Sequence, residues 1–240
     1  MIKEPRAVEP YLSIVTGTLN RRASFNRLVK SIQERTNVPW ELVVSDASDE
    51  PYPDQYPENV RIIPERPRLG CVKGYNRAFS EAVGRWVVWL NDDAEVQHGW
   101  AEAAVGFMEH HPEVGLGAIY YCEGAPPFIV NEYWDMAYAN FGIVSRDLGN
   151  QVGWFDDDLE MYGCDNSLTF RVLMAYRGVA TIPGSRIWHH SVPDQWKTLN
   201  QRYRASDAAT LKRKYTPHRQ QMQLVYKRTK SLIGPMVIGD

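Results

Sequence analysis

The chain of 240 residues is 44% hydrophobic and 23% charged, the balance of an ordinary globular protein, and its formal net charge is −2. No apolar run approaches the length that spans a bilayer, and the N-terminus lacks a signal peptide's apolar core, so we expect a cytoplasmic protein. Three cysteines without a close pair exclude a disulfide framework or a zinc site, and indicate buried thiols in a reducing compartment: Cys71, Cys122 and Cys164.

Strand-like and helix-like patterns alternate through the first half of the chain. The expected strands cover 11–16, 41–45, 60–63 and 86–90. The expected helices cover 24–32 with Ser24 as N-cap, 75–82 with Gly84 placed to end it, and 100–108 closed off by Pro112. This alternation predicts an α/β fold in which helices flank a mainly parallel sheet.

The second half has a looser pattern from about residue 115. Strands are expected at 115–121, 141–145, 179–183 and 186–188, and helices at 165–176 and 203–214. A stretch rich in proline and aromatic residues separates the first two of these strands. No internal repeat is present.

The C-terminal segment is strongly basic. Residues 197–230 hold ten Lys and Arg against the single acid Asp207, a net +9 that leaves −11 for the rest of the chain. Such a segment can contact nucleic acid, an anionic membrane face or an acidic partner. The interpretation we favour is a solvated amphipathic helix with a polar tail, and we expect no nucleic-acid partner.

The apolar run WVVWL is followed by Asn91 and then by two acidic side chains, Asp92 and Asp93. Thr16 and Asp46 also lie just past predicted strand ends, and in open α/β sheets the carboxyl ends of the strands open on one crevice. Neighbouring carboxylates repel each other unless a cation or proton intervenes, and oxygen ligands favour Mg²⁺ or Mn²⁺. The alternative is a capped turn in which the Asp side chains accept local backbone N–H groups.

Several common nucleotide and nucleophile motifs are missing from the sequence. It has no GxxxxGK[ST], no GxGxxG after the first strand and no GxSxG, which disfavours P-loop, nicotinamide and α/β-hydrolase chemistry. The segment RPRLGCVKGYNRAF supplies Arg66, Arg68, Lys73 and Arg77 around two glycines. These cations suit a phosphorylated ligand, although a solvated loop and helix start would have the same composition.

A set of motifs occurs in one order along residues 11–192. IVTGTLNR is a strand with a polar turn, and VVSDASDE places an acid after the second strand. LGCVKGYNRAFSEAVGRWVVWLNDDAEV runs into the acids, and VGWFDDDLEMYGCDNSLTFRV and RIWHHS follow. Together they resemble the family 2 glycosyltransferases of the GT-A fold. The order of the motifs is more specific than any one of them.

The resemblance implies a nucleotide-sugar site. Asp46 matches the acid that contacts the base, Thr16 and Arg21 lie in the turn that shelters the nucleoside, and Asp92 faces the sugar side of the nucleotide. The full set expected to bind the nucleotide sugar is Thr16, Thr18, Arg21, Asp46, Lys73, Asn76 and Asp92.

The resemblance also implies a metal and a base. Asp93 matches the metal-binding carboxylate, and His189 matches a residue that can ligate the Mn²⁺ or Mg²⁺. Asp165 matches the catalytic base. The chain departs from the family where Asn91 replaces the first Asp of the D-x-D motif, which puts three-residue metal ligation in doubt. It also has Cys164 and Ser167 in place of acids, which suggests an altered acceptor pocket.

Three residues are candidates for the acceptor side. Trp154 could stack on a sugar ring or pack in the core, and Asp158 could belong to a polar rim or a solvated loop. His190 could contact ligand or form a structural pair with His189 at a strand end.

The implied activity is inverting transfer of a sugar from a nucleoside-diphosphate sugar to a hydroxyl of a glycan, lipid-linked or small-molecule acceptor. A UDP-sugar is the leading candidate for the donor. A nucleotidyltransferase or nucleotide-sugar pyrophosphorylase, and a non-catalytic binding module, stay open. We expect a glycosyltransferase domain over 1–192, with a nucleotide-binding half at about 1–98 and an acceptor-binding half at about 99–192. A basic helical extension over 193–240 follows, with room for peripheral membrane contact.

Overall fold

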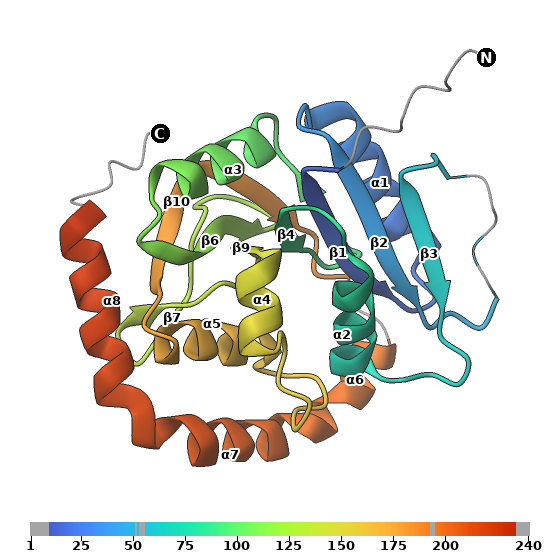
Figure 1. Cartoon of the computed structure of the whole chain (residues 1–240). Coiled ribbons are helices and arrows are strands. Elements are labelled where there is room, and N and C mark those ends of the chain that lie inside the picture. Colours follow the sequence, from blue (N-terminus) through green and yellow to red (C-terminus); the bar gives the residue numbers. More distant parts are fainter. Residues whose placement is uncertain (1–9, 51, 53–55, 193–194, 234–240) are drawn as a thin grey trace, which may run out of the picture.

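The structure, a computed structural model, describes residues 10–50, 52, 56–192 and 195–233. A twisted sheet lies at its centre with helices on both faces, and the C-terminal helices run along the lower edge and then up the left side (Figure 1). In the described part of the chain the strands are β1 (Leu12–Thr18), β2 (Trp40–Asp46), β3 (Val60–Pro64), β4 (Trp86–Trp89), β5 (Ala94–Val96), β6 (Val114–Glu123), β7 (Glu132–Tyr133), β8 (Met136–Ala137), β9 (Gly142–Ser145) and β10 (Gly178–His189).

The helices of these residues vary from one turn to four. They are α1 (Arg22–Arg35), α2 (Cys71–Glu81), α3 (Trp100–His110), α4 (Arg146–Val152), α5 (Cys164–Met174), α6 (Gln195–Asn200), α7 (Arg204–Tyr215) and α8 (Arg219–Ile233), with short 3₁₀ turns η1 (Gln201–Tyr203) and η2 (Thr216–His218). None of the described helices is both long and apolar enough to cross a membrane.

The main sheet has the strand order β3-β2-β1-β4-β9-β6-β10-β5, and β7 and β8 form a separate hairpin. The strands β3, β2, β1 and β4 are parallel, as are β6 and β10, whereas β9 runs antiparallel between β4 and β6 and β5 runs antiparallel to β10. The predicted α/β fold with a mostly parallel sheet is confirmed.

Both faces of the sheet are covered, which is why its strands read as continuous apolar runs. In β1, Leu12 and Ile14 belong to the same buried cluster as Phe25 of α1. Val15, on the other face, belongs to the cluster that holds Phe79 of α2. The first cluster also takes in α3, and the second takes in α5, α7 and α8.

The structure differs locally from the sequence-based elements. Helix α1 already begins at Arg22, so Ser24 is a buried residue within its first turn and not the expected N-cap. The two strands expected at 179–183 and 186–188 are one strand, β10, with a register shift between Ile182 and Arg186. Gly184 lies in that shift at φ +82°, a conformation that suits glycine in a bulge.

The basic extension packs against the domain. Leu211 and Tyr215 of α7 and Met222 of α8 are buried in the same cluster as Phe170 of α5. In Figure 1, α7 crosses below α5 and α8 rises beside β10. The extension therefore contributes to the core that supports α5.

Candidate active site

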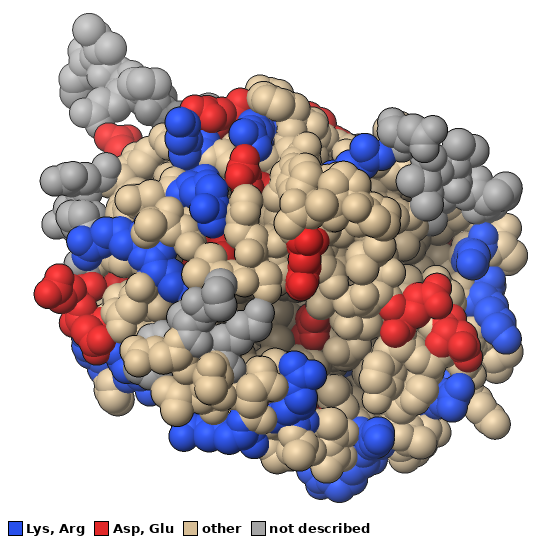
Figure 2. All heavy atoms as spheres, turned by 180° about the vertical axis from the view of Figure 1, so that it is seen from behind, with Lys and Arg blue, Asp and Glu red and all other residues tan. Residues whose placement is uncertain are grey.

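Two adjoining cavities open beyond the carboxyl ends of β1, β2 and β4. We call them the Asp92 cavity, about 390 Å³, and the Asp165 cavity, about 300 Å³. Figure 2 shows the molecule hollowed near the middle of one face, with acidic side chains beside the hollow. The residues that line both cavities are Arg21, Cys71, Tyr75, Asn91, Met161 and Asn200.

Asp92 lies in the turn directly after β4 and is almost fully buried. Its Oδ2 accepts a hydrogen bond from Thr18 Oγ1 at 2.9 Å, and its Oδ1 lies 3.2 Å from Arg21 Nη1. Burial raises the pKa of Asp92 to about 6, and the charge of Arg21 partly offsets that rise. The three side chains form a polar, partly cationic wall of the Asp92 cavity.

Asp93 points instead into the Asp165 cavity, where it meets His189. Its Oδ2 accepts the backbone N–H of Val192 at 3.1 Å, while Oδ1 lies 3.1 Å from His189 Nε2. Although burial alone would raise it, the pKa of Asp93 is lowered by the neighbouring His189 and by the charge of Arg21. This carboxylate is therefore held in its ionised form.

The contact between Asp93 and His189 fits a divalent cation. When His189 Nε2 accepts the amide hydrogen of Asn91 Nδ2, 3.2 Å away, it has no hydrogen to donate to Asp93 Oδ1. That buried oxygen indeed makes no hydrogen bond in the described part of the chain. Two adjacent ligands on an octahedral ion with bonds of roughly 2.1 Å lie about 3 Å apart, the separation observed here.

The protein offers such a cation only two ligands among the residues that the structure describes. No group of three or more His, Cys, Asp or Glu there is placed to hold a metal ion. A site of this kind is usually completed by water and by the phosphate oxygens of a substrate.

Asp165 lies across the same cavity in the first turn of α5. Gly163, at φ +80°, precedes that helix and turns the chain sharply into it. Asp165 Oδ1 accepts the backbone N–H of Asn166 at 2.8 Å, and Oδ2 accepts Asn140 Nδ2 at 3.0 Å. Burial raises the pKa of Asp165 to about 6, against these hydrogen bonds.

The predicted site residues fall into two groups. Those that line a cavity are Thr18, Arg21, Asp92, Asp93, Asp165 and His189. Asp46 is fully buried between Ser45 and Ala47, which both line the Asp92 cavity. Its Oδ1 accepts Ser48 N at 2.9 Å, and its buried Oδ2 makes no hydrogen bond among the described residues.

Besides Asp46, three residues expected at the nucleotide sugar line neither cavity. Thr16 is fully buried within β1 because it precedes the strand end by two residues. Lys73 is on the exposed side of α2. Asn76 is turned away to Phe155 O and Asp157 Oδ1, at 2.9 and 2.6 Å.

The three acceptor candidates also lie outside both cavities. Trp154 is buried and stacks on Phe79, with ring centroids 4.4 Å apart and an angle of 5° between the planes. His190 Nε2 lies 3.0 Å from Glu95 Oε2, on the far side of the strand from His189. Asp158 is exposed and pairs with Lys214 at 2.8 Å.

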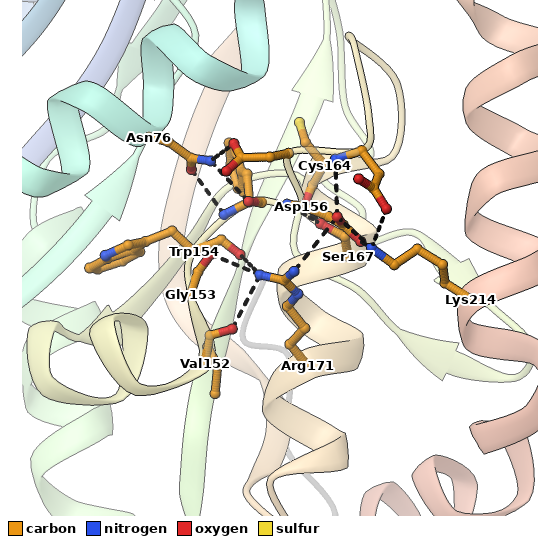
Figure 3. Close-up of polar contacts among 12 residues, drawn as sticks. Asn76, Val152, Gly153, Trp154, Asp156, Cys164, Ser167, Arg171 and Lys214 are labelled. Carbon is orange, nitrogen blue, oxygen red and sulfur yellow. Dashed lines mark hydrogen bonds and ion pairs between the residues drawn. The ribbon is translucent and has the colours of Figure 1, made fainter.

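Two of the three acids after Phe155, Asp156 and Asp158, bind side chains of α7 (Figure 3). Asp156 is buried and accepts the hydroxyl of Tyr215 at 2.7 Å, with Lys214 Nζ at 2.7 Å and Arg171 Nη2 at 3.6 Å. Lys214 also reaches Asp158. Asp158, for which the sequence leaves a polar rim or a solvated loop open, is thus an exposed partner of α7, and Asp156 has a structural role.

Sequence reasoning missed several residues of the cavity walls. Leu199, Asn200, Arg202 and Tyr203 come from the segment read as a separate tail and line the Asp92 cavity. Glu65, buried, lines it too and accepts Leu69 N at 2.8 Å and the hydroxyl of Ser45. No local pattern marks these positions, because the tertiary fold alone brings them to the cavity.

The fold and the site together define the class of the protein: a GT-A fold with acids at the end of a central strand. The family model described as Glycosyl transferase family 2 matches residues 13–154, more than half of the chain. The chain belongs to glycosyl transferase family 2 and is an enzyme of that family. No curated protein sequence matches it.

Solved structures share the fold at low sequence identity. The S. aureus TarS fragment 1–349 has a TM-score of 0.63 at 15% identity, covering 93% of this chain and 72% of that one. The mannosyltransferase PcManGT from Pyrobaculum calidifontis, in complex with GDP-Man and Mn²⁺, has a TM-score of 0.63 at 16% identity, with 95% and 77% covered. GalNAc-T7, with UDP, GalNAc and Mn²⁺, has 0.65 at 14%, with 78% and 44% covered.

Proposed function

We propose that this enzyme is an inverting, metal-dependent hexosyltransferase. It moves a sugar from a nucleoside-diphosphate sugar to an acceptor hydroxyl, and a UDP-sugar is the leading candidate for the donor. One observation carries the proposal: the Asp93–His189 pair and Asp165 line one cavity, which joins the Asp92 cavity. Donor and acceptor bound in the two cavities would meet at their shared wall.

In this proposal the Asp92 cavity holds the nucleotide. Thr18 and Arg21 fix the carboxylate of Asp92 for contact with the donor's ribose. The buried Asp46 Oδ2, which makes no hydrogen bond within the described part of the chain, lies between two residues of the cavity wall and suits an N–H group of the base.

Asp93 and His189 would hold Mn²⁺ or Mg²⁺, which supplies positive charge to the diphosphate as the glycosidic bond breaks. Arg21, between Asp92 and Asp93, adds a fixed cation to the same wall. Both devices stabilise negative charge on the leaving group.

Asp165 would take the proton of the acceptor hydroxyl. Its pKa, raised to about 6, leaves it ionised at neutral pH yet more basic than an exposed carboxylate. Such a base contributes roughly 10²–10⁴-fold to a rate. Attack from its side of the cavity, opposite the diphosphate, inverts the anomeric centre.

The test is a donor screen with Mn²⁺ and released nucleotide as the readout. UDP-, GDP- and dTDP-sugars are each incubated with the enzyme, with and without glycan acceptors, and nucleoside diphosphate is measured. We expect one donor class to release nucleoside diphosphate in an Asp93-dependent way. Release of pyrophosphate would indicate a nucleotidyltransferase, and binding without any release would indicate a non-catalytic module.

We further propose that the extension docks on an anionic membrane face that presents a lipid-linked acceptor. The exposed side of α7 and α8 carries Lys212, Arg213, Lys227, Arg228 and Lys230. Leu224 and Leu232 of α8 are 69% and 62% exposed beside them. Figure 2 shows basic side chains along the lower rim, where Figure 1 has α7.

Cosedimentation with vesicles of 30% phosphatidylserine tests this docking. Binding should fall steeply when salt rises above roughly 0.15 M, because surface charge is screened over about 8 Å there. Equal binding to neutral vesicles, or none to anionic ones, would contradict it.

A further inference from the structure

A short chain of amide hydrogen bonds ends on Asp165. Asn140, which directly precedes Phe141 and β9, lines the Asp165 cavity and donates from Nδ2 to Asp165 Oδ2 at 3.0 Å. Its Oδ1 in turn accepts Asn131 Nδ2 at 2.8 Å. Its backbone carbonyl accepts the indole N–H of Trp89 at 2.9 Å, so backbone and side chain are both fixed.

Asn131 is itself held from two sides. Its Nδ2 lies 2.7 Å from the hydroxyl of Tyr121 and 3.1 Å from the hydroxyl of Tyr138. Its backbone carbonyl accepts Tyr138 N at 3.0 Å. The amide is thereby anchored to β6 and to the segment after the β7–β8 hairpin.

This series of hydrogen bonds determines which end of the Asn140 amide faces Asp165. Because Asn131 donates to Asn140 Oδ1, the Nδ2 end must point to Asp165. A flipped amide would set its oxygen against Asp165 Oδ2 and its nitrogen against Asn131 Nδ2, and both contacts would be repulsive.

We propose that Asn140 is a positioning residue for Asp165, and that Asn131 holds Asn140 in the orientation that makes it so. The proposal rests on the proposed role of Asp165 as base. Asn140 Nδ2 occupies one side of Oδ2 and Asn166 N occupies Oδ1, which directs the remaining lone pairs of the carboxylate toward the cavity.

Asn140 also favours the ionised carboxylate, since a hydrogen bond to the charged form stabilises that form. The titratable groups that act on Asp165 at close range are uncharged thiols and phenols: Cys71 from α2, Tyr121 from β6, Tyr138 after β8 and Cys164 of α5. The charged or titratable side chains of Arg21, Asp93, Glu123 and His189 line the same cavity. Burial already raises the pKa of Asp165, so loss of the Asn140 donor raises it further.

The test is the pH profile of kcat at saturating donor and acceptor. Asn140→Ala should move the acidic limb up by about one pH unit, the shift expected for losing one hydrogen bond to a charged group. Asn140→Asp keeps the shape but sets a second carboxylate beside Asp165, and should move the limb by at least as much. Asn131→Asp cannot donate to Asn140 Oδ1 and should shift it less, in the same direction.

Asn150→Ala is the matched control. Its amide accepts the indole N–H of Trp154 outside both cavities, so its loss should leave the limb in place even where it lowers the melting temperature. A donor KM within about twofold of the wild type in all four variants would separate positioning of the base from binding.

The outcomes distinguish this proposal from the proposed function. If Asp165→Asn keeps most of the activity, the base assignment is wrong and the positioning role is wrong with it. If Asp165→Asn is inactive while Asn140→Ala and Asn140→Asp both keep the wild-type limb, the base stands and the positioning role is overturned. Should one Asn140 variant fail to fold, the other and Asn131→Asp decide.

Discussion

Asp207 of α7 ties the extension to the loop before α5, which borders both cavities. Its buried carboxylate accepts three consecutive backbone N–H groups, from Glu160 at 3.1 Å, Met161 at 3.0 Å and Tyr162 at 2.8 Å. Met161 lines both cavities, and Tyr162 is two residues before the start of α5. We predict that Asp207→Ala loosens this loop and impairs turnover as well as stability.

The size of the effect follows from the number and kind of bonds. Each hydrogen bond to a charged group is worth about 1.5–3 kcal/mol net. Two effects reduce the net loss in Asp207→Ala. Water can hydrogen-bond to the N–H groups of the partly exposed loop, and the free-energy cost of burying the carboxylate is no longer incurred. We therefore expect about 3 kcal/mol less stability, and a fall in kcat/KM of about 10–100-fold from misplacement of the cavity wall.

Urea unfolding followed by tryptophan fluorescence measures the first quantity, and steady-state kinetics below the transition measure the second. Lys212→Ala is the matched control, because it removes one charge from the exposed side of the same helix and should change stability by under about 0.5 kcal/mol. If Asp207→Ala and Lys212→Ala unfold at the same urea concentration, the three hydrogen bonds to Asp207 do not stabilise the protein and the prediction is wrong.

Three further outcomes are expected. Below pH 6 the wild-type kcat should fall about tenfold per pH unit, because the pKa of Asp165 is raised to about 6 and only its ionised form can accept a proton; a flat profile down to pH 5 would contradict this. Trp154→Ala should lower the free energy of unfolding by about 3 kcal/mol in urea while the donor KM stays unchanged, because the ring stacks on Phe79 and lies outside both cavities. A raised donor KM with normal stability would indicate instead that Trp154 contacts the ligand. Chelation by EDTA should abolish turnover, and added Mn²⁺ should restore it. At the same Mn²⁺ concentration, Asp93→Asn should recover roughly 10²-fold less activity than the wild type. Equal recovery in both would show that Asp93 does not bind the cation.

The part of the site that could be predicted from sequence lies at strand ends. Asp92 and Asp93 follow an apolar run after the single residue Asn91, and the topology of a parallel sheet then brings their turn to the crevice. Asp165 was placed by its motif, and the structure has it in the cavity of Asp93. Such positions are fixed by local sequence and by topology together.

Side-chain direction could not be predicted in the same way. His189 is the last residue of β10 and His190 directly follows the strand, and the pairing of His189 with Ala94 of β5 helps to decide which histidine meets Asp93. His189 reaches Asp93, whereas His190 reaches Glu95. Trp154 looked suited to a sugar ring, but the position of Phe79 on α2 determines its stacking. Asp207 was counted only as an exception in a basic tail, because its three partners lie 45 to 47 residues away in sequence.

The most direct test of the account is turnover by Asp165→Asn, measured beside its affinity for the nucleotide. The substitution keeps the size of the side chain but removes the proton acceptor. We predict that kcat falls by about 10²–10⁴-fold while nucleoside-diphosphate binding stays within about twofold. Turnover close to that of the wild type would contradict sugar transfer driven by a base at this position.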